Sequence, residues 1–115
     1  MKKGQPKFST VLTEAVKDGL NSIGPSISDA VLVYLEKKAT IRFDSSALDP
    51  KSLDEGLKEV LGYGTEIVER KILESLHLRL EVKQKLKGSF DFAEEVKKAQ
   101  KLFSSHNPSV LKQLV

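Results

Sequence analysis

Few residues in this chain of 115 could bind a metal or act as nucleophiles. There are two histidines, His77 and His106, and no cysteine. The lack of cysteine excludes disulfides, thiolate metal sites and cysteine nucleophiles. The positions three and four residues from His77 offer only two glutamates, which are ordinary surface charges on a helix. Since a metal site needs several converging ligands, we expect no metal site and no cofactor.

The sequence Gly62-Tyr63-Gly64 has the composition of a phosphate-binding loop but not its context. Such a loop needs a strand before the glycines and a helix after them, whereas here a helical pattern precedes them. A tight corner between two helices explains the glycines better, because glycine adopts a positive φ without strain. At such a corner Tyr63 is an exposed contact residue.

Five acidic residues between positions 44 and 59 could provide an acid–base pair if burial separated their pKa values. Placement near helix N-termini explains two of them without any catalytic role. The nucleophile motif G-x-S-x-G is absent, so we expect the protein not to be an enzyme. A carboxylate enzyme stays open as an alternative. It would need a deep pocket with two or more ionisable groups of shifted pKa.

The net charge of +3 is unevenly distributed. Residues 1–39 carry +2, residues 40–81 carry −3 and residues 82–115 carry +4. Every basic residue of the last block is a lysine, and base recognition favours arginine. We therefore interpret Lys97, Lys98 and Lys101 mainly as a solvated helix face. Nucleic-acid binding through these lysines is the alternative function.

Helical periodicity of the apolar residues dominates the chain. It predicts amphipathic helices over about residues 8–23, 53–61, 65–86 and 92–103, and a nearly all-apolar helix over about 27–38. We expect this last helix to be the buried central element. Three of the helix starts carry capping signals: Ser26 as an N-cap, a capping box of Ser52 with Glu55, and a capping box of Asp91 with Glu94.

These patterns predict an all-α orthogonal or helical bundle of four or five helices, with one short extended segment near residues 40–44. We divide the chain into a flexible N-terminus (1–7), a helical domain (8–81) and a Lys-rich helical C-terminal extension (82–115). No stretch approaches the roughly 18 to 20 apolar residues that span a bilayer, and no secretory leader is recognisable. We expect a cytoplasmic protein without membrane contact.

Two stretches resemble a known family. They are IGPSISDAVLVYLEKK (residues 23–38) and LKEVLGYGTEIVE (residues 57–69). Over about residues 8–80 the chain resembles the Nitrosopumilus output-domain group, small helical domains of ammonia-oxidising archaea. It departs from the group at Leu61, where an aromatic residue is common, and at Thr65, where a small one is common. The resemblance implies an all-α module that is attached to signalling proteins or stands alone, and it brings no catalytic residues.

Apolar seams on nearly every predicted helix favour an interaction module with a signalling-output-like role. The C-terminal turn adds Leu111 and Leu114, whose exposure on a small protein would be costly. We expect this turn to dock on the domain or on a second subunit. The expected partner is a second copy of the chain in a homodimer, or another protein.

Overall fold

The computed structural model describes residues 8–38, 41, 49–81, 86 and 88–105. Its elements are α1 (Phe8–Asn21), α2 (Pro25–Lys37), α3 (Pro50–Leu61), the 3₁₀ turn η1 (Gly62–Gly64), α4 (Thr65–Arg79) and α5 (Phe92–Ser105). Within those ranges there is no strand, which confirms the all-α prediction of four or five helices. The predicted flexible N-terminus lies outside the described residues. So does the extended segment near 40–44, apart from Ile41, whose N–H donates to the Leu35 carbonyl at 2.9 Å.

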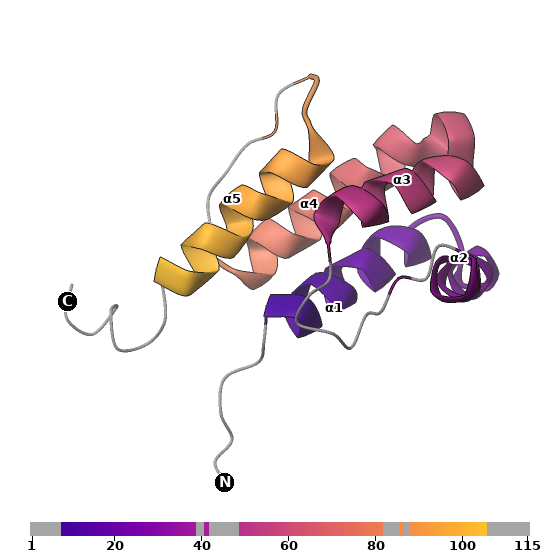
Figure 1. Ribbon diagram of the computed structural model, residues 1–115, viewed down its shortest axis with the longest axis horizontal. Helices are drawn as coiled ribbons and strands as arrows, with labels where there is room; N and C mark the ends of the chain where they lie inside the picture. Colours follow the sequence, from indigo (N-terminus) through magenta and orange to yellow (C-terminus); the bar gives the residue numbers. More distant parts are fainter. Residues whose placement is uncertain (1–7, 39–40, 42–48, 82–85, 87, 106–115) are drawn as a thin grey trace, which may run out of the picture.

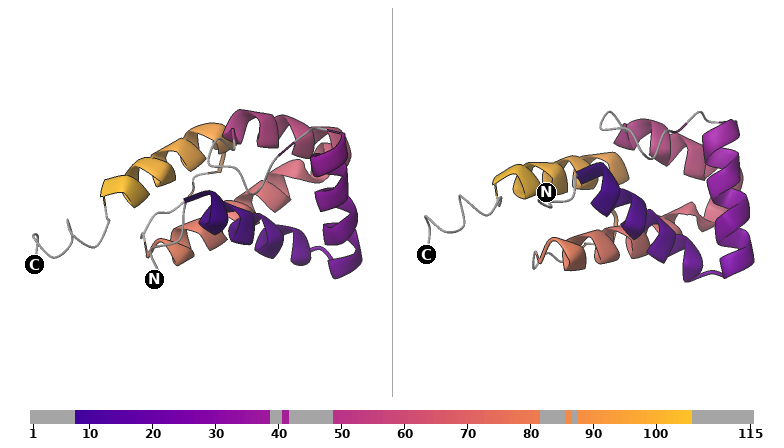
Figure 2. Two further views of the ribbon diagram at one scale, coloured as in Figure 1. Left: turned by 60° about the horizontal axis from the view of Figure 1, so that its bottom comes forward. Right: turned by 90° about the horizontal axis from the view of Figure 1, so that it is seen from below.

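Four helices run along the length of the molecule and one crosses its end. α1 and α4 lie side by side, α3 and α5 cover them, and α2 passes across one end of this arrangement (Figures 1 and 2). α5 packs against α3 and α4, and its Phe92, Val96 and Ala99 are buried in the same core as the other helices. None of the helices in the described ranges has the length and apolar content needed to cross a membrane.

The contact between α1 and α4 is the largest between any two of these helices. α1 buries an apolar stripe at three- and four-residue spacing, and Val68, Ile72, Leu73 and Leu76 of α4 face it in the core. Gly19 lies at the closest approach. A Cβ atom built on Gly19 would collide with the Ile72 side chain and would lie 3.0 Å from the Ile72 backbone nitrogen. The absence of a side chain at Gly19 therefore sets the distance between the two helices.

The prediction that the helix over residues 27–38 is central was wrong. α2 buries only Ser28, Val31 and Leu35, and Val33 is 49% exposed. Residues 31 and 35 form one narrow stripe, and Val33 points away from it because a helix turns 100° per residue. α2 contacts α1 and α3 from the end of the bundle, so its remaining apolar side chains have no second layer to enter.

Several helix boundaries differ from the sequence predictions. α2 starts two residues early, at Pro25 with Gly24 as its N-cap, so Ser26 lies inside the helix. α3 begins at Pro50, and its N-cap is Asp49, whose carboxylate accepts the Lys51 N–H at 3.3 Å and the Ser52 hydroxyl at 3.0 Å. Proline at the first helical position has its φ fixed at a helical value, which explains the earlier start.

The C-terminal ends of α1 and α4 also come early. α1 ends at Asn21 rather than near residue 23. α4 ends at Arg79 rather than near Leu86, because Glu81 takes a left-handed backbone conformation with φ of 59°. The Asp91 cap is confirmed, since its carboxylate accepts the Glu94 N–H at 3.2 Å.

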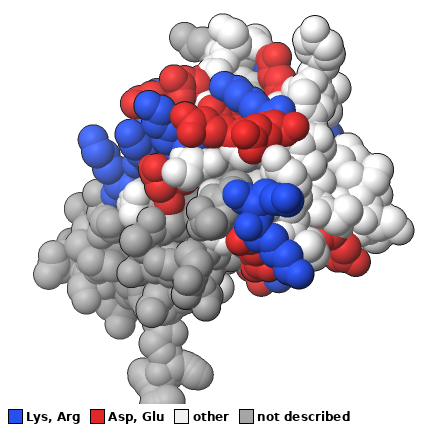
Figure 3. Space-filling view, turned by 45° about the vertical axis from the view of Figure 1, so that its right-hand side comes forward, with Lys and Arg blue, Asp and Glu red and all other residues white. Residues whose placement is uncertain are grey.

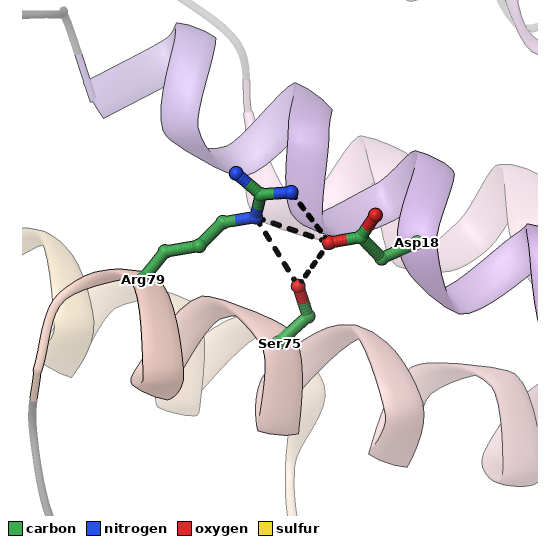
Figure 4. Close-up of polar contacts among 3 residues, drawn as sticks. All are labelled: Asp18, Ser75 and Arg79. Carbon is green, nitrogen blue, oxygen red and sulfur yellow. Dashed lines mark hydrogen bonds and ion pairs between the residues drawn. The ribbon is translucent and has the colours of Figure 1, made fainter.

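A polar cluster joins α1 to α4 at the surface beside their apolar contact (Figure 4). The Asp18 carboxylate Oδ2 accepts Ser75 Oγ at 2.6 Å and Arg79 Nη2 at 2.6 Å. The hydrogen bond from Ser75, together with the bond and positive charge of Arg79, lowers the pKa of Asp18. Asp18, Ser75 and Arg79 thus fix the lateral register of the two helices.

Replacing Gly19 with alanine should destabilise the fold by about 2 kcal/mol, because overpacking against Ile72 outweighs the gain in helix propensity. Thermal and urea unfolding measure the change. Gly64→Ala is the matched control, since Gly64 has a negative φ of −79° and a Cβ there meets nothing within 4 Å. Equal stabilities for the two variants would contradict the close contact between α1 and α4.

Asp18→Asn should lower the free energy of unfolding by about 0.5 kcal/mol at neutral pH, a small effect because the ion pair is partly exposed. The pKa of Asp18 is lowered from 3.8 in the folded state. Its contribution is therefore complete above pH 4 and lost as the pH falls through the lower folded value. Urea unfolding of both proteins from pH 7 to pH 2 should show the difference shrinking towards zero, and a difference that persists in acid would argue against the ion pair.

Candidate functional site

A pocket of about 530 Å³ opens between α3, the start of α4 and the segment that leads into α5. We call it the acidic pocket. Its lining residues come from three separate parts of the chain: Asp54, Lys58, Gly62, Tyr63, Thr65, Glu66, Glu69, Ser89, Phe90, Asp91 and Phe92. It lies at the Gly62–Gly64 corner, which the sequence singled out for a different reason.

The corner that forms one wall of the pocket is held by hydrogen bonds. Gly62 has φ of 58°, so it supplies the positive φ expected of a tight corner between helices. The Thr65 hydroxyl lies 2.7 Å from the Gly62 carbonyl and 3.3 Å from the Leu57 carbonyl, and it donates to them. Helix α3 precedes the glycines, as the sequence indicated, so the strand that a phosphate loop requires is not there.

Arg70 holds the opposite wall. Its Nη2 donates to the Gly88 carbonyl at 3.0 Å, and its guanidinium carbon lies 5.0 Å from the centre of the Phe90 ring. A guanidinium over an aromatic face is attracted by the ring quadrupole. These two contacts tie the segment before α5 to α4 and place Ser89, Phe90 and Asp91 at the pocket.

Among the described residues of the lining, four side chains are acidic and one is basic. The acids are Asp54, Glu66, Glu69 and Asp91, and the base is Lys58. Lys58 Nζ lies 3.0 Å from Asp54 Oδ2 in an ion pair within α3, and this contact raises the pKa of Lys58. The positive charge of Lys58 is therefore already engaged by one of the pocket's carboxylates.

Glu69 is the most unusual residue of the pocket. Only 5% of it is exposed, and its Oε2 has no hydrogen-bond partner among the described residues. Burial raises the pKa of Glu69 to about 9, helped by a hydrogen bond with the Asp54 carboxyl and by the negative charges of Asp54 and Asp91. Lys58 opposes this shift, with a smaller effect than burial or Asp54. At neutral pH Glu69 is thus a neutral carboxylic acid, the form that a buried site favours.

The sequence did not single out Glu69, although it contained a signal. Glu69 stands three residues before Ile72, four before Leu73 and seven before Leu76, so it occupies an apolar-stripe position of α4. A lone glutamate at such a position must be buried with the stripe. What the sequence could not provide was the pocket around it, because Asp54 and Asp91 come from distant parts of the chain.

Tyr63 and Ile67 protrude beside the pocket, and we call them the Tyr63–Ile67 patch. Tyr63 is fully exposed at 106% of its reference area and Ile67 is 63% exposed. The exposure of Tyr63 agrees with its predicted place at the corner. The helical pattern of the sequence would place Ile67 with the inward-facing residues of α4, and this is wrong. The buried stripe of α4 runs through Val68 and Glu69, and the preceding residue faces outward.

The lysines predicted as contacts lie on the exposed side of α5. Lys97, Lys98 and Lys101 are all exposed, and Lys98 Nζ lies 3.3 Å from Glu95 Oε2. On the face drawn in Figure 3, basic and acidic side chains lie side by side, and a broad area next to them carries neither. The other two predicted contact residues, Leu111 and Leu114, lie outside the described residues.

The described histidine is a core residue. His77 is buried in α4, and burial lowers its pKa, so it is neutral at physiological pH. Across the part of the chain that the structure describes, no group of three His, Cys, Asp or Glu side chains could hold a metal ion. His106 lies outside that part.

Glu69→Gln should stabilise the fold by at least about 1 kcal/mol at pH 8, because the amide removes the cost of keeping a buried acid protonated. The folded protein keeps this proton up to about pH 9, whereas an unfolded chain loses it near 4.5. Stability of the parent chain must therefore fall as the pH rises between these values.

Urea unfolding of both proteins at pH 5, 7 and 8.5 measures this dependence. Glu74→Gln, an exposed position on the same helix, controls for the change of net charge. A parent and a Glu69→Gln variant that respond identically to pH would show that Glu69 is ionised in the folded state.

Comparison with known proteins gives one match. Residues 7–98 match the model of the family described as Nitrosopumilus output domain 5. The match extends past residue 80, where the sequence resemblance stops, and includes the first half of α5. No curated protein and no solved structure matches the chain.

Proposed function

We propose a protein-interaction role for this chain, which belongs to the Nitrosopumilus output domain 5 family. In this proposal the chain is a helical module that passes on a signal by docking another protein. The Tyr63–Ile67 patch is the observation that carries it, because a fully exposed tyrosine beside an exposed isoleucine on a folded helix corner is typical of a contact surface.

The backbone that carries the patch is held by hydrogen bonds. Tyr63 and Ile67 are four residues apart across the junction of η1 and α4, so their side chains emerge on neighbouring turns. The hydrogen bonds of Thr65 fix the corner between them. Fixing the backbone of the corner before binding reduces the entropy that is lost when a partner docks, which favours an interaction function.

Charge around the patch favours a partner other than a second copy of the chain. Glu66 lies between Tyr63 and Ile67 in the sequence and is exposed, and the acidic pocket opens next to them. In a two-fold symmetric dimer the same patch faces itself, so these acids would approach their own counterparts. A partner with a basic rim around an apolar pocket fits better, and we prefer it to the homodimer that the sequence suggested.

Catalysis and nucleic-acid binding have weaker support. A carboxylate enzyme needs two groups whose pKa values are shifted towards neutrality. In the pocket the pKa of Glu69 is shifted upwards from the acidic range, whereas the pKa of Lys58 is shifted further from neutrality. For nucleic-acid binding, Lys98 is already paired with Glu95, and Glu94 and Glu95 occupy the first turn of the same helix. We therefore propose binding without chemistry, and a protein as the partner.

A photo-crosslinking amino acid placed at Tyr63 should capture one discrete partner in cells of the native host, and the same group at the exposed Glu14 of α1 should not. Ile67→Ser should reduce the Tyr63 adduct at least several-fold while changing stability by less than about 0.5 kcal/mol, as expected for an exposed site. Gel mobility and mass spectrometry identify the adduct.

Sedimentation of the purified chain over a range of concentrations distinguishes the two kinds of partner. A monomer is the expected result. A dimer that Ile67→Ser dissociates would replace the proposed partner with a second copy. Equal crosslinking from positions 63 and 14, or an adduct indifferent to Ile67→Ser, would contradict the interaction surface.

A further inference from the structure

We propose that the acidic pocket binds an organic cation, a guanidinium or primary ammonium group on a short apolar stem, with Glu69 as its buried partner. This inference does not depend on the Tyr63–Ile67 patch, because it concerns a ligand that the isolated chain should bind by itself. It rests on the unpartnered oxygen of Glu69, the charge of the lining and the size of the pocket.

The first observation is the unpartnered Glu69 Oε2. Buried polar atoms in folded proteins nearly always have a hydrogen-bond partner, and each exception requires an explanation. Glu69 lines the acidic pocket and is 95% buried, since its exposed fraction is 5%. The Glu69 carboxyl forms a hydrogen bond with Asp54, and Oε2 is the oxygen that has no partner among the described residues. A ligand carrying N–H groups would supply a donor to it.

The charge of the lining selects a cation. Lys58 is the one basic residue among the described lining residues, and it is paired with Asp54 at 3.0 Å. Within this set no base is paired with Glu66, Glu69 or Asp91. An anionic ligand would meet these carboxyl groups directly. A guanidinium or ammonium group instead forms charge-assisted hydrogen bonds with carboxylates, which are stronger than neutral ones.

The size and the walls of the pocket select an organic ligand. Its volume of about 530 Å³ is within the range of roughly 300 to 1,000 Å³ that small-molecule sites occupy. Phe90 provides aromatic surface for a hydrocarbon stem, with the exposed Tyr63 at the rim. A bare metal ion fits poorly, because no three acidic or imidazole side chains among the described residues converge closely enough to hold one.

Binding should release a proton. Glu69 is neutral in the free protein at neutral pH, since its pKa is raised to about 9. The arriving positive charge favours the ionised carboxylate, so the Glu69 proton leaves to the solvent as the cation enters. Asp54 and Asp91 raise the pKa of Glu69, and the positive charge of Lys58 lowers it. The positive charge of the bound cation would likewise lower the pKa of Glu69.

The test is isothermal titration calorimetry of the full chain with butylguanidinium and butylammonium, and with neutral butylurea as the matched control ligand. We expect saturable binding of at least one cation and none of the urea. Titrations at pH 7 in two buffers of different ionisation enthalpy should show release of close to one proton for each cation bound. Affinity should rise roughly tenfold for each pH unit while the pH is well below the pKa of Glu69.

Glu69→Gln tests the assigned residue. Glutamine has the shape of the protonated acid and cannot ionise, so the variant should fold, bind the cation at least tenfold more weakly and release no proton. Glu74→Gln, with the same charge change at an exposed position of α4, should bind like the parent chain. Circular dichroism of both variants verifies that they are folded.

The cation could be a free small molecule or a side chain of a polypeptide, and capped arginine separates the two. Arginine with blocked amino and carboxyl groups binding as tightly as butylguanidinium would show that a polypeptide side chain can enter. Binding of butylguanidinium alone would assign the pocket to a free cation. Failure of both cations to bind, or equal binding by the parent and Glu69→Gln, would overturn the proposal while leaving the crosslinking result at Tyr63 unaffected.

Discussion

The close approach of α1 and α4 at Gly19 is the constraint on which the rest of the structure depends. Gly19 has no Cβ atom, so the Ile72 backbone can approach α1 more closely than any other residue at position 19 would allow. This contact fixes both the separation of the helices and the rotation of α4 about its own axis. Interiors pack too densely for a helix face to slip by one residue at such a point.

The rotation of α4 then decides which of its residues can have a function. Glu69 precedes Ile72 by three residues and lies on the same buried stripe, whereas Ile67 lies just outside it. The rotation of α4 therefore buries the acid Glu69 and exposes the apolar Ile67 within one helical turn. Both departures from ordinary burial occur at the same corner, next to Tyr63, which is why the pocket and the patch are neighbours.

Local signals in the sequence predicted the helices well, and the failures came from tertiary context. The seam of Phe92, Val96 and Ala99 and the Asp91 cap could be predicted because spacing and capping are local. The place of α2 could not, since a run of apolar residues does not reveal how many faces will be covered. Glu69 could be suspected from its stripe position, but its environment depends on Asp54 and Asp91, which only the fold brings to it.

The attachment of Arg70 to Gly88 and Phe90 has a consequence for how the molecule assembles. The wall that carries Asp91 reaches α4 only when the segment before α5 is docked, so the pocket is complete only with the C-terminal helix in place. A ligand in the pocket would therefore stabilise the docked position of α5. If the proposed cation binds, attachment of α5 and occupancy of the pocket are thermodynamically linked, and the ligand adds to the core contacts of Phe92, Val96 and Ala99 that hold α5 in place.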